Sequence, residues 1–130
     1  MNVVYNNCYG GFGLSHEAVM LYAKLKGITL YTDPEQSVWG TCHYFTIPVE
    51  QYREFESAND IKACNEGYFS PEHDISRDDP DLVKVVLQLG EKANGPSAEL
   101  AICFVPDGVD YEIEEYDGKE SVVGRKTYYS

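Results

Sequence analysis

The most unusual chemistry in the sequence lies in residues 8–15, where glycines and aromatic residues precede an expected helix. Glycines let backbone N–H groups approach a ligand closely, and a helix N-terminus favours an anionic group. Aromatic rings in the same segment can stack on a base. The candidate ligand-binding residues here are Cys8, Tyr9, Gly10, Gly11 and Phe12. The spacing matches neither a P-loop nor a dinucleotide fingerprint, so a tight turn between strand and helix is the alternative interpretation.

The sequence contains three arginines, Arg53, Arg77 and Arg125. A phosphate site would draw on them, because guanidinium groups bind phosphate in a bidentate manner. Arg77 is a candidate, although pairing with the acids that flank it in sequence is the simpler explanation. Arg125 is the better candidate, since it stands beside Lys126 and two tyrosines, with a disordered terminus as the alternative.

Residues 114–120 contain four acidic side chains around Tyr116, Asp117 and Gly118. Such a segment can contact ribose hydroxyls, a cation or a basic partner surface, and we include Tyr116 and Asp117 among the candidate ligand-binding residues. A solvated hairpin tip is the alternative.

Catalysis has little support in the sequence. Cys8 with His16 or His43 is the one conceivable thiol–imidazole pair, and no common hydrolase or metalloprotease motif is present. The four cysteines are widely spaced and lack zinc-ligand spacing, so we expect no metal. We therefore predict a binding protein without catalytic residues or cofactor, with a cysteine-dependent enzyme as the minor alternative.

The charge balance limits the partners. The chain has 22 acidic and 10 basic residues and a net charge of −12. This field repels nucleic acid and anionic membranes, so neither is expected as a direct partner. An anionic ligand would need a local positive pocket. Alternatively, the carboxylates mimic phosphates and occupy a basic nucleic-acid channel of a partner protein, or they simply keep the protein soluble. The start of the chain lacks a secretory pattern, which favours a reducing cytoplasm.

Several elements are expected to position these residues in the first two thirds of the chain. A strand over residues 2–5 leads through the glycine-rich turn into a helix capped by Ser15 and Gly27. Strands are expected at residues 28–32 and 41–47. A short helix over residues 50–57 is then followed by an irregular, solvated excursion to residue 81.

The sequence of the last third of the chain predicts one helix and three strands. Asp79 and Pro80 begin a helix that ends at Gly90 or by Gly95. Strands follow at residues 98–105, 111–114 and 120–123, and a hairpin turn at Asp117-Gly118 joins the last two. Residues 1–130 are thus expected to form a single compact α+β domain, with a mainly antiparallel sheet and two principal helices packed on it.

Two parts of the sequence resemble a family of small bacteriophage proteins. The first is residues 4–15, which read VYNNCYGGFGLS. The second combines residues 77–86, RDDPDLVKVV, with residues 113–122, IEEYDGKESV. The resemblance is to the phage sponge proteins that defeat Thoeris immunity by sequestering its cyclic ADP-ribose-type messenger without cleaving it.

This resemblance implies a mechanism. A dimer, or a larger assembly such as a hexamer, would bury a small anionic nucleotide, a cyclic ADP-ribose isomer or a cyclic di- or trinucleotide, between subunits in the host cytoplasm. Arginine, backbone donors and aromatic stacking would hold it. Binding without turnover is stoichiometric, so it requires tight affinity and more protein than messenger.

Overall fold

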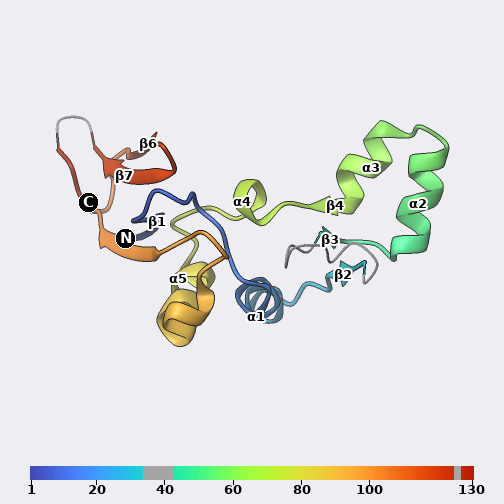
Figure 1. Ribbon diagram of the computed structural model, residues 1–130, viewed down its shortest axis with the longest axis horizontal. Helices are drawn as coiled ribbons and strands as arrows, with labels where there is room; N and C mark the ends of the chain where they lie inside the picture. Colours follow the sequence, from blue (N-terminus) through green and yellow to red (C-terminus); the bar gives the residue numbers. More distant parts are fainter. Residues whose placement is uncertain (34–42, 125–126) are drawn as a thin grey trace.

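The computed structural model describes residues 1–33, 43–124 and 127–130 and shows an α+β fold (Figure 1). Its longer strands come from the two ends of the chain, whereas three short strands and most of its helices come from the middle. In chain order the elements are β1 (Asn2–Asn6), α1 (His16–Lys26), β2 (Tyr31–Thr32), β3 (Tyr44–Phe45), α2 (Val49–Ser57), α3 (Ile61–Gly67), β4 (Tyr68–Phe69), α4 (Pro71–Asp74), α5 (Pro80–Leu89), the 3-10 helix η2 (Gly90–Ala93), β5 (Leu100–Phe104), β6 (Glu112–Tyr116) and β7 (Lys119–Val123).

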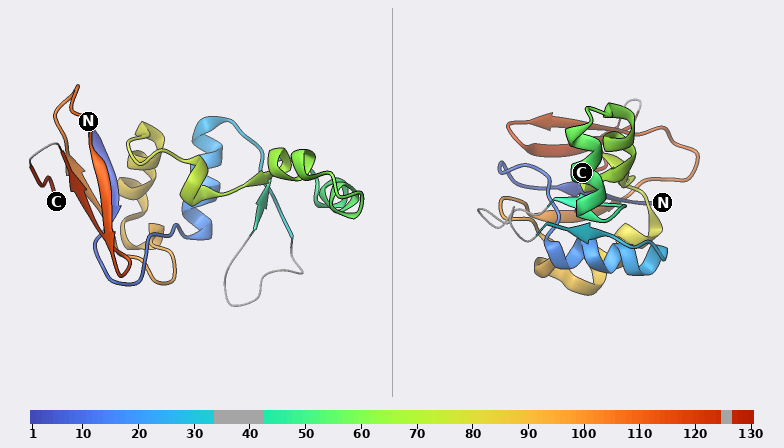
Figure 2. Two further views of the ribbon diagram at one scale, coloured as in Figure 1. Left: turned by 90° about the horizontal axis from the view of Figure 1, so that it is seen from above. Right: turned by 90° about the vertical axis from the view of Figure 1, so that its right-hand side faces the viewer.

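All strand pairings in the described residues are antiparallel, as predicted. β1 pairs with β5, β6 pairs with β7, and β2, β3 and β4 form a small third sheet. The strands therefore form three small sheets rather than one larger sheet. Seen from above, β1, β5, β6 and β7 form a layer, α5 packs beside it, and α1 lies on the far side of α5 (Figure 2).

Strand β1 joins two hydrophobic clusters because successive side chains of a strand point to opposite faces. Val4 packs into the main core with α1 and α5, where Leu82 and Val85 are fully buried. Val3 packs on the other side with Val105 and Val122, in a second cluster that holds the β6–β7 hairpin. The N-terminal strand is thus buried on both faces.

The two principal helices begin where the sequence predicts. Ser15 caps α1 by accepting a hydrogen bond from the Ala18 N–H, and Gly27 ends the helix with a φ of 73°. Asp79 caps α5 by accepting from the Asp81 N–H, and Pro80 occupies the first helical position. The Ser15 cap places the N-terminus of α1 directly after the glycine-rich segment.

The middle of the chain differs from the prediction. The expected strand over residues 28–32 is reduced to β2, because the Ile28 N–H still bonds to the Ala23 carbonyl and closes α1. Of the strand expected at residues 41–47, residues 41–42 lie outside the described part and residues 44–45 form β3. The expected helix over residues 50–57 is confirmed as α2.

The irregular excursion predicted after residue 57 is wrong. Asp60 caps α3 by accepting a hydrogen bond from the Ala63 N–H, and β4 and α4 follow without a long loop. The strands β2, β3 and β4 with α2 and α3 form an arm that extends away from the rest of the molecule (Figure 1). Within the described ranges, no helix combines the length and apolar character needed to cross a bilayer.

Candidate functional site

Residues 8–13, here called the glycine loop, are held by the side chain of Asn6. This amide is fully buried. Its Nδ2 donates to the carbonyl oxygens of Cys8 and Gly118, each at 2.8 Å, and its Oδ1 accepts from the Glu99 N–H at 2.8 Å. One side chain therefore ties the glycine loop to the β6–β7 turn and to the residue before β5. This bridging role of Asn6 was not predicted from the sequence.

Glycine is required where these segments meet. A Cβ on Gly118 would lie 2.6 Å from the Gly11 nitrogen and 2.6 Å from the Tyr9 oxygen. A Cβ on Gly10 would lie 1.8 Å from the Ser97 carbonyl oxygen. Backbone packing thus accounts for these two glycines without a ligand, as the tight-turn interpretation expects.

The β6–β7 hairpin turn forms where the sequence predicts. Asp117 and Gly118 both have positive φ values, of 51° and 89°, as a two-residue type I′ turn requires. Because Gly118 packs against the glycine loop, the turn brings Tyr116 and Asp117 to the same end of the molecule as Tyr9.

Arg77 is paired with a distant acid rather than with its neighbours in sequence, which corrects the simpler interpretation above. Its two terminal nitrogens donate to the two carboxylate oxygens of Glu120, at 2.7 and 2.9 Å. The Phe12 ring covers the guanidinium, with 3.4 Å from the Arg77 Cζ to the ring centroid. The Asn6 N–H donates to the same carboxylate at 2.9 Å. In this structure Arg77 therefore holds the glycine loop in place.

The burial of Glu120 could have been predicted from the alternation of residues along β7. Its side chain is 7% exposed. Glu120 shares the buried face of β7 with Val122, as the two-residue period of a strand dictates. The acidic tip predicted for this hairpin thus contains one carboxylate that belongs to the interior.

Two aromatic rings remain exposed where the loop and the turn meet. Tyr9 is 63% exposed and Tyr116 is 79% exposed. Lys119 pairs with Tyr116 across the hairpin, and its Nζ lies 5.5 Å from the centroid of the Tyr9 ring. We call these three residues the tyrosine–lysine surface. It combines stacking groups with a cation, which is the chemistry that a nucleotide requires.

A cavity of about 480 Å³ lies on the other side of the glycine loop, at the N-terminus of α1. His16 borders it, and the His16 Nδ1 lies 3.0 Å from the Tyr44 hydroxyl. Glu72 also borders it and places a carboxylate at the cavity. The cavity therefore offers backbone donors together with a negative charge that opposes an anion.

The cysteine and histidine side chains are directed to other partners. The Cys8 Sγ lies 3.2 Å from the Ser97 carbonyl oxygen and 3.4 Å from the Asn6 Oδ1. His16 contacts Tyr44, and the His43 Nδ1 lies 3.1 Å from the Tyr68 hydroxyl. Neither imidazole is the hydrogen-bond partner of the Cys8 thiol in this structure.

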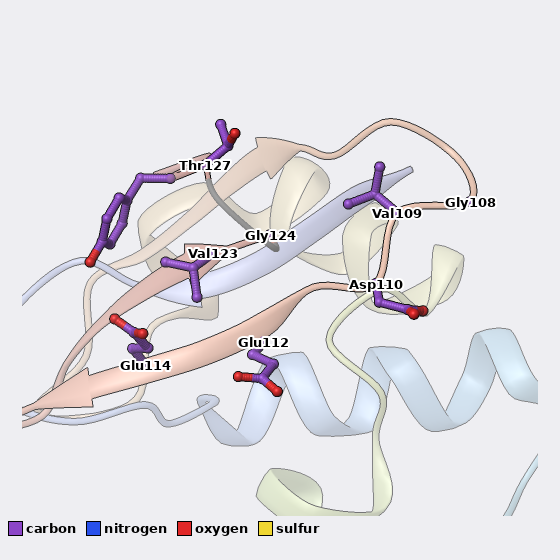
Figure 3. Close-up of a pocket in the computed structure, with 9 residues that line it drawn as sticks. Gly108, Val109, Asp110, Glu112, Glu114, Val123, Gly124 and Thr127 are labelled. Atoms are coloured by element: carbon purple, nitrogen blue, oxygen red, sulfur yellow. The ribbon is translucent and has the colours of Figure 1, made fainter.

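An acidic cavity lies beside the β6–β7 hairpin, and no residue of the glycine loop lines it (Figure 3). It has a volume of about 1050 Å³. Asp110, Glu112 and Glu114 line it together with Tyr128. Among the residues that the structure describes, no group of three histidine, cysteine, aspartate or glutamate side chains is arranged to hold a metal ion.

The end of the chain folds back onto β7. The Tyr129 N–H donates to the Val122 carbonyl at 2.8 Å, and the Gly124 N–H donates to the Thr127 carbonyl at 2.7 Å. Residues 127–130 are therefore ordered against the hairpin, so the disordered terminus considered from the sequence is wrong for them. Arg125, a predicted ligand-binding residue, lies outside the described residues.

Most of the predicted site residues meet around the glycine loop. Cys8 to Phe12 belong to the loop, Arg77 contacts Phe12 and Glu120, and the β6–β7 turn packs against the loop. No protein-family model, curated protein or solved structure matches this chain.

Proposed function

We propose that the tyrosine–lysine surface binds a small nucleotide and holds it chemically unaltered. The observation that carries the proposal is the meeting of two distant segments, the glycine loop and the β6–β7 turn, which leaves Tyr9, Tyr116 and Lys119 together and exposed. A base stacks on a tyrosine ring because every base has an aromatic face. The Lys119 ammonium then attracts the phosphate.

The proposal assigns Arg77 an indirect role. Its guanidinium is occupied by the Glu120 carboxylate and covered by the Phe12 ring. A phosphate would have to displace a buried carboxylate to reach it. We therefore expect Lys119 and the exposed amides of the glycine loop to contact the ligand, while Arg77 keeps the loop in position.

The contacts of Cys8 favour binding over turnover. An activated thiol needs a neighbouring base, and the hydrogen-bond partners of the Cys8 Sγ are the Ser97 carbonyl oxygen and the Asn6 Oδ1, neither of which is a base. The resemblance to phage sponge proteins suggests which ligands to try first: cyclic ADP-ribose isomers and cyclic di- and trinucleotides.

Isothermal titration with these nucleotides tests the proposal. We expect binding by the unaltered protein, and Tyr9→Ala and Tyr116→Ala should each weaken it by roughly tenfold, since loss of one stacking contact costs about 1–3 kcal/mol. Lys119→Glu should weaken it at least as much. Tyr128→Ala is the matched control, because Tyr128 is 70% exposed but lies at the acidic cavity.

Two results would count against the proposal. One is the absence of binding heat for every nucleotide at micromolar protein. The other is binding that Tyr9→Ala, Tyr116→Ala and Lys119→Glu all leave unchanged, which would place the ligand elsewhere.

A second function is favoured by the acidic cavity of Figure 3. We propose as the alternative that the carboxylates of Asp110, Glu112 and Glu114 mimic phosphates and block a basic nucleic-acid channel of a host defence protein. Such binding should weaken steeply with salt and compete with DNA or RNA. The triple variant Asp110→Asn, Glu112→Gln and Glu114→Gln removes the three charges with little change of shape. If pull-downs from host lysate recover no basic partner that this variant releases, the alternative fails.

A further inference from the structure

Strand β5 has one edge that β1 does not cover. The Val105 N–H donates to the Met1 carbonyl at 2.8 Å, which fixes the hydrogen-bonded register of the two strands. Alternate residues of an antiparallel strand bond to the same neighbour. The backbone N–H and C=O groups of Leu100, Ile102 and Phe104 therefore point away from β1.

The free part of this edge is short and well defined. The Leu100 N–H is taken by the Asn94 Oδ1 at 2.9 Å, and Pro106 beyond the strand has no N–H. Within residues 1–33, 43–124 and 127–130, the outward backbone groups of Ile102 and Phe104 have no hydrogen-bond partner. In Figure 1 β5, drawn in orange, lies at the lower margin of the strand layer.

Strand β5 itself carries no charge in a molecule whose net charge is −12. β5 reads LAICF and has no charged residue, proline or glycine, the usual devices that prevent strand edges from pairing. Phe104 is 65% exposed, and Leu87 on the adjoining helix α5 is 70% exposed. A groove of about 700 Å³ runs between α5 and β5 beside them, and its lining also includes Glu91 and Glu99.

We propose that this edge pairs with the same edge of a second copy of the chain. The register that satisfies both free residues sets Ile102 opposite Phe104 of the partner and Phe104 opposite Ile102 of the partner. The two-fold axis then passes between the two copies of Cys103. Four backbone hydrogen bonds form, and β1 and β5 of each copy join into one continuous four-stranded antiparallel sheet.

Two observations select a copy of the chain as the occupant. The pairing is self-complementary, because the exposed Phe104 ring meets Ile102 of the partner, which is half-buried in one copy alone. Two molecules of the same strong negative charge repel each other least where the paired segment itself carries no charge, and the five residues of β5 meet that condition. The inference is independent of nucleotide binding, because none of its residues belongs to the glycine loop or the β6–β7 turn.

The molecular mass in solution is the first test. Sedimentation equilibrium of the full chain should give twice the 14.7 kDa of one copy. Phe104→Lys should raise the dissociation constant of the dimer roughly tenfold or more, because it places a cation at the centre of the contact. Ile61→Lys is the matched control: Ile61 is 73% exposed on α3, and the change adds the same charge far from β5. Circular dichroism should show both variants folded.

Cross-linking through Cys103 is the second test, and it does not depend on Phe104. Opposed residues in a pair without backbone hydrogen bonds have Cα atoms about 4.5 Å apart, within the range of a disulfide. In a variant with Cys8, Cys42 and Cys64 changed to Ser, diamide should take two electrons from the two Cys103 thiols and give a covalent dimer. Cys103→Ser should abolish it.

The proposal is overturned if the protein is monomeric up to millimolar concentration. A dimer that neither responds to Phe104→Lys nor cross-links at Cys103 also overturns it, because such a dimer uses another surface. If the variant with a single cysteine fails to fold, the mass measurement alone decides.

Discussion

At the residue scale, the glycine loop is organised by buried polar side chains, and desolvation gives them their energetic importance. A bidentate arginine–carboxylate pair restricts geometry strongly. Removing one partner of a buried ion pair lowers the free energy of unfolding by more than the intact pair contributes to it. The reason is that the remaining charge stays buried without a partner. Arg77, Glu120 and Phe12 form such a unit beneath the loop.

Arg77→Met should lower the free energy of unfolding by about 3 kcal/mol or more, because it leaves the Glu120 carboxylate, 7% exposed, without its cation. Glu120→Gln should also destabilise the protein. The double variant should be less destabilised than the sum of the two single changes, since neither charge then remains buried alone. Urea denaturation of the four proteins measures this coupling. Additive effects would show that the pair does not stabilise the loop.

Arg77 was predicted from the sequence to bind a ligand because the sequence does not show that Glu120 pairs with its guanidinium. A lone arginine among acids in a sequence predicts an ion pair but does not identify the partner, and Glu120 is 43 residues away. The alternation of β7 was the available signal. It places Glu120 on the face of Val122 and therefore in the interior.

At the scale of elements, the β6–β7 turn positions the candidate site through the contact of Gly118 with the glycine loop. Gly118→Ala should lower the free energy of unfolding by about 2 kcal/mol or more, since it combines a strained positive φ with a backbone clash. Gly108→Ala is the matched control. Gly108 also has a positive φ, of 84°, but a Cβ there meets nothing within 4 Å.

Thermal or urea unfolding of the two glycine variants separates backbone strain from the steric clash. Gly108→Ala introduces strain alone and should lower the free energy of unfolding by only about 1 kcal/mol. Gly118→Ala should also weaken nucleotide binding, whereas Gly108→Ala should not. Equal destabilisation by both changes would contradict the close packing of the turn on the loop.

The contact between α1 and α5 predicts how stability depends on pH. The Tyr22 hydroxyl donates to the Asp79 Oδ2 at 2.7 Å, and the Lys26 Nζ lies 3.1 Å from the same oxygen. Although burial acts in the opposite direction, hydrogen bonds from Tyr22, the Asp81 N–H and Lys26 hold the pKa of Asp79 below its ordinary value of 3.8. Burial and the bond to Asp79 raise the pKa of Tyr22 to about 12.

A carboxyl group whose pKa is lower in the folded state stabilises the protein above its unfolded pKa. That contribution should be fully present above pH 3.8 and should be lost as the pH falls through the lower folded value. Asp79→Asn retains a side chain that can cap α5 but removes the charge. The variant should therefore lose less stability than the unaltered protein as the pH falls below 3.8, while the two pH profiles should run parallel above it; denaturation across both ranges measures this. Profiles that stay parallel below pH 3.8 would contradict the assignment.

At the scale of the whole molecule, the sequence predicts the local elements better than their assembly. The caps Ser15 and Asp79 and the turn at Asp117-Gly118 are short-range signals, and all three are confirmed. The division into three small sheets depends on contacts between distant residues, which no local pattern encodes. The excursion after residue 57 was misjudged because exposed short helices such as α3 carry little apolar periodicity.

The candidate site shows the same limit. Its glycine loop and turn are evident in the sequence as unusual segments, yet their contact depends on Asn6, one buried amide without a distinctive pattern around it. The exposure of Tyr9 and Tyr116 beside Lys119 is likewise a result of the assembly. Such a surface is visible only once the two segments are placed together.

The central claim is that the protein holds a nucleotide and returns it unaltered, and one measurement tests it most directly. A limiting amount of cyclic ADP-ribose isomer or cyclic oligonucleotide is incubated with excess protein, the free nucleotide is measured after filtration, and the protein is then denatured by heat. The account predicts that free nucleotide disappears on mixing and is recovered intact after denaturation. Free nucleotide that never falls for any of these compounds, or recovery of a converted product, would contradict it.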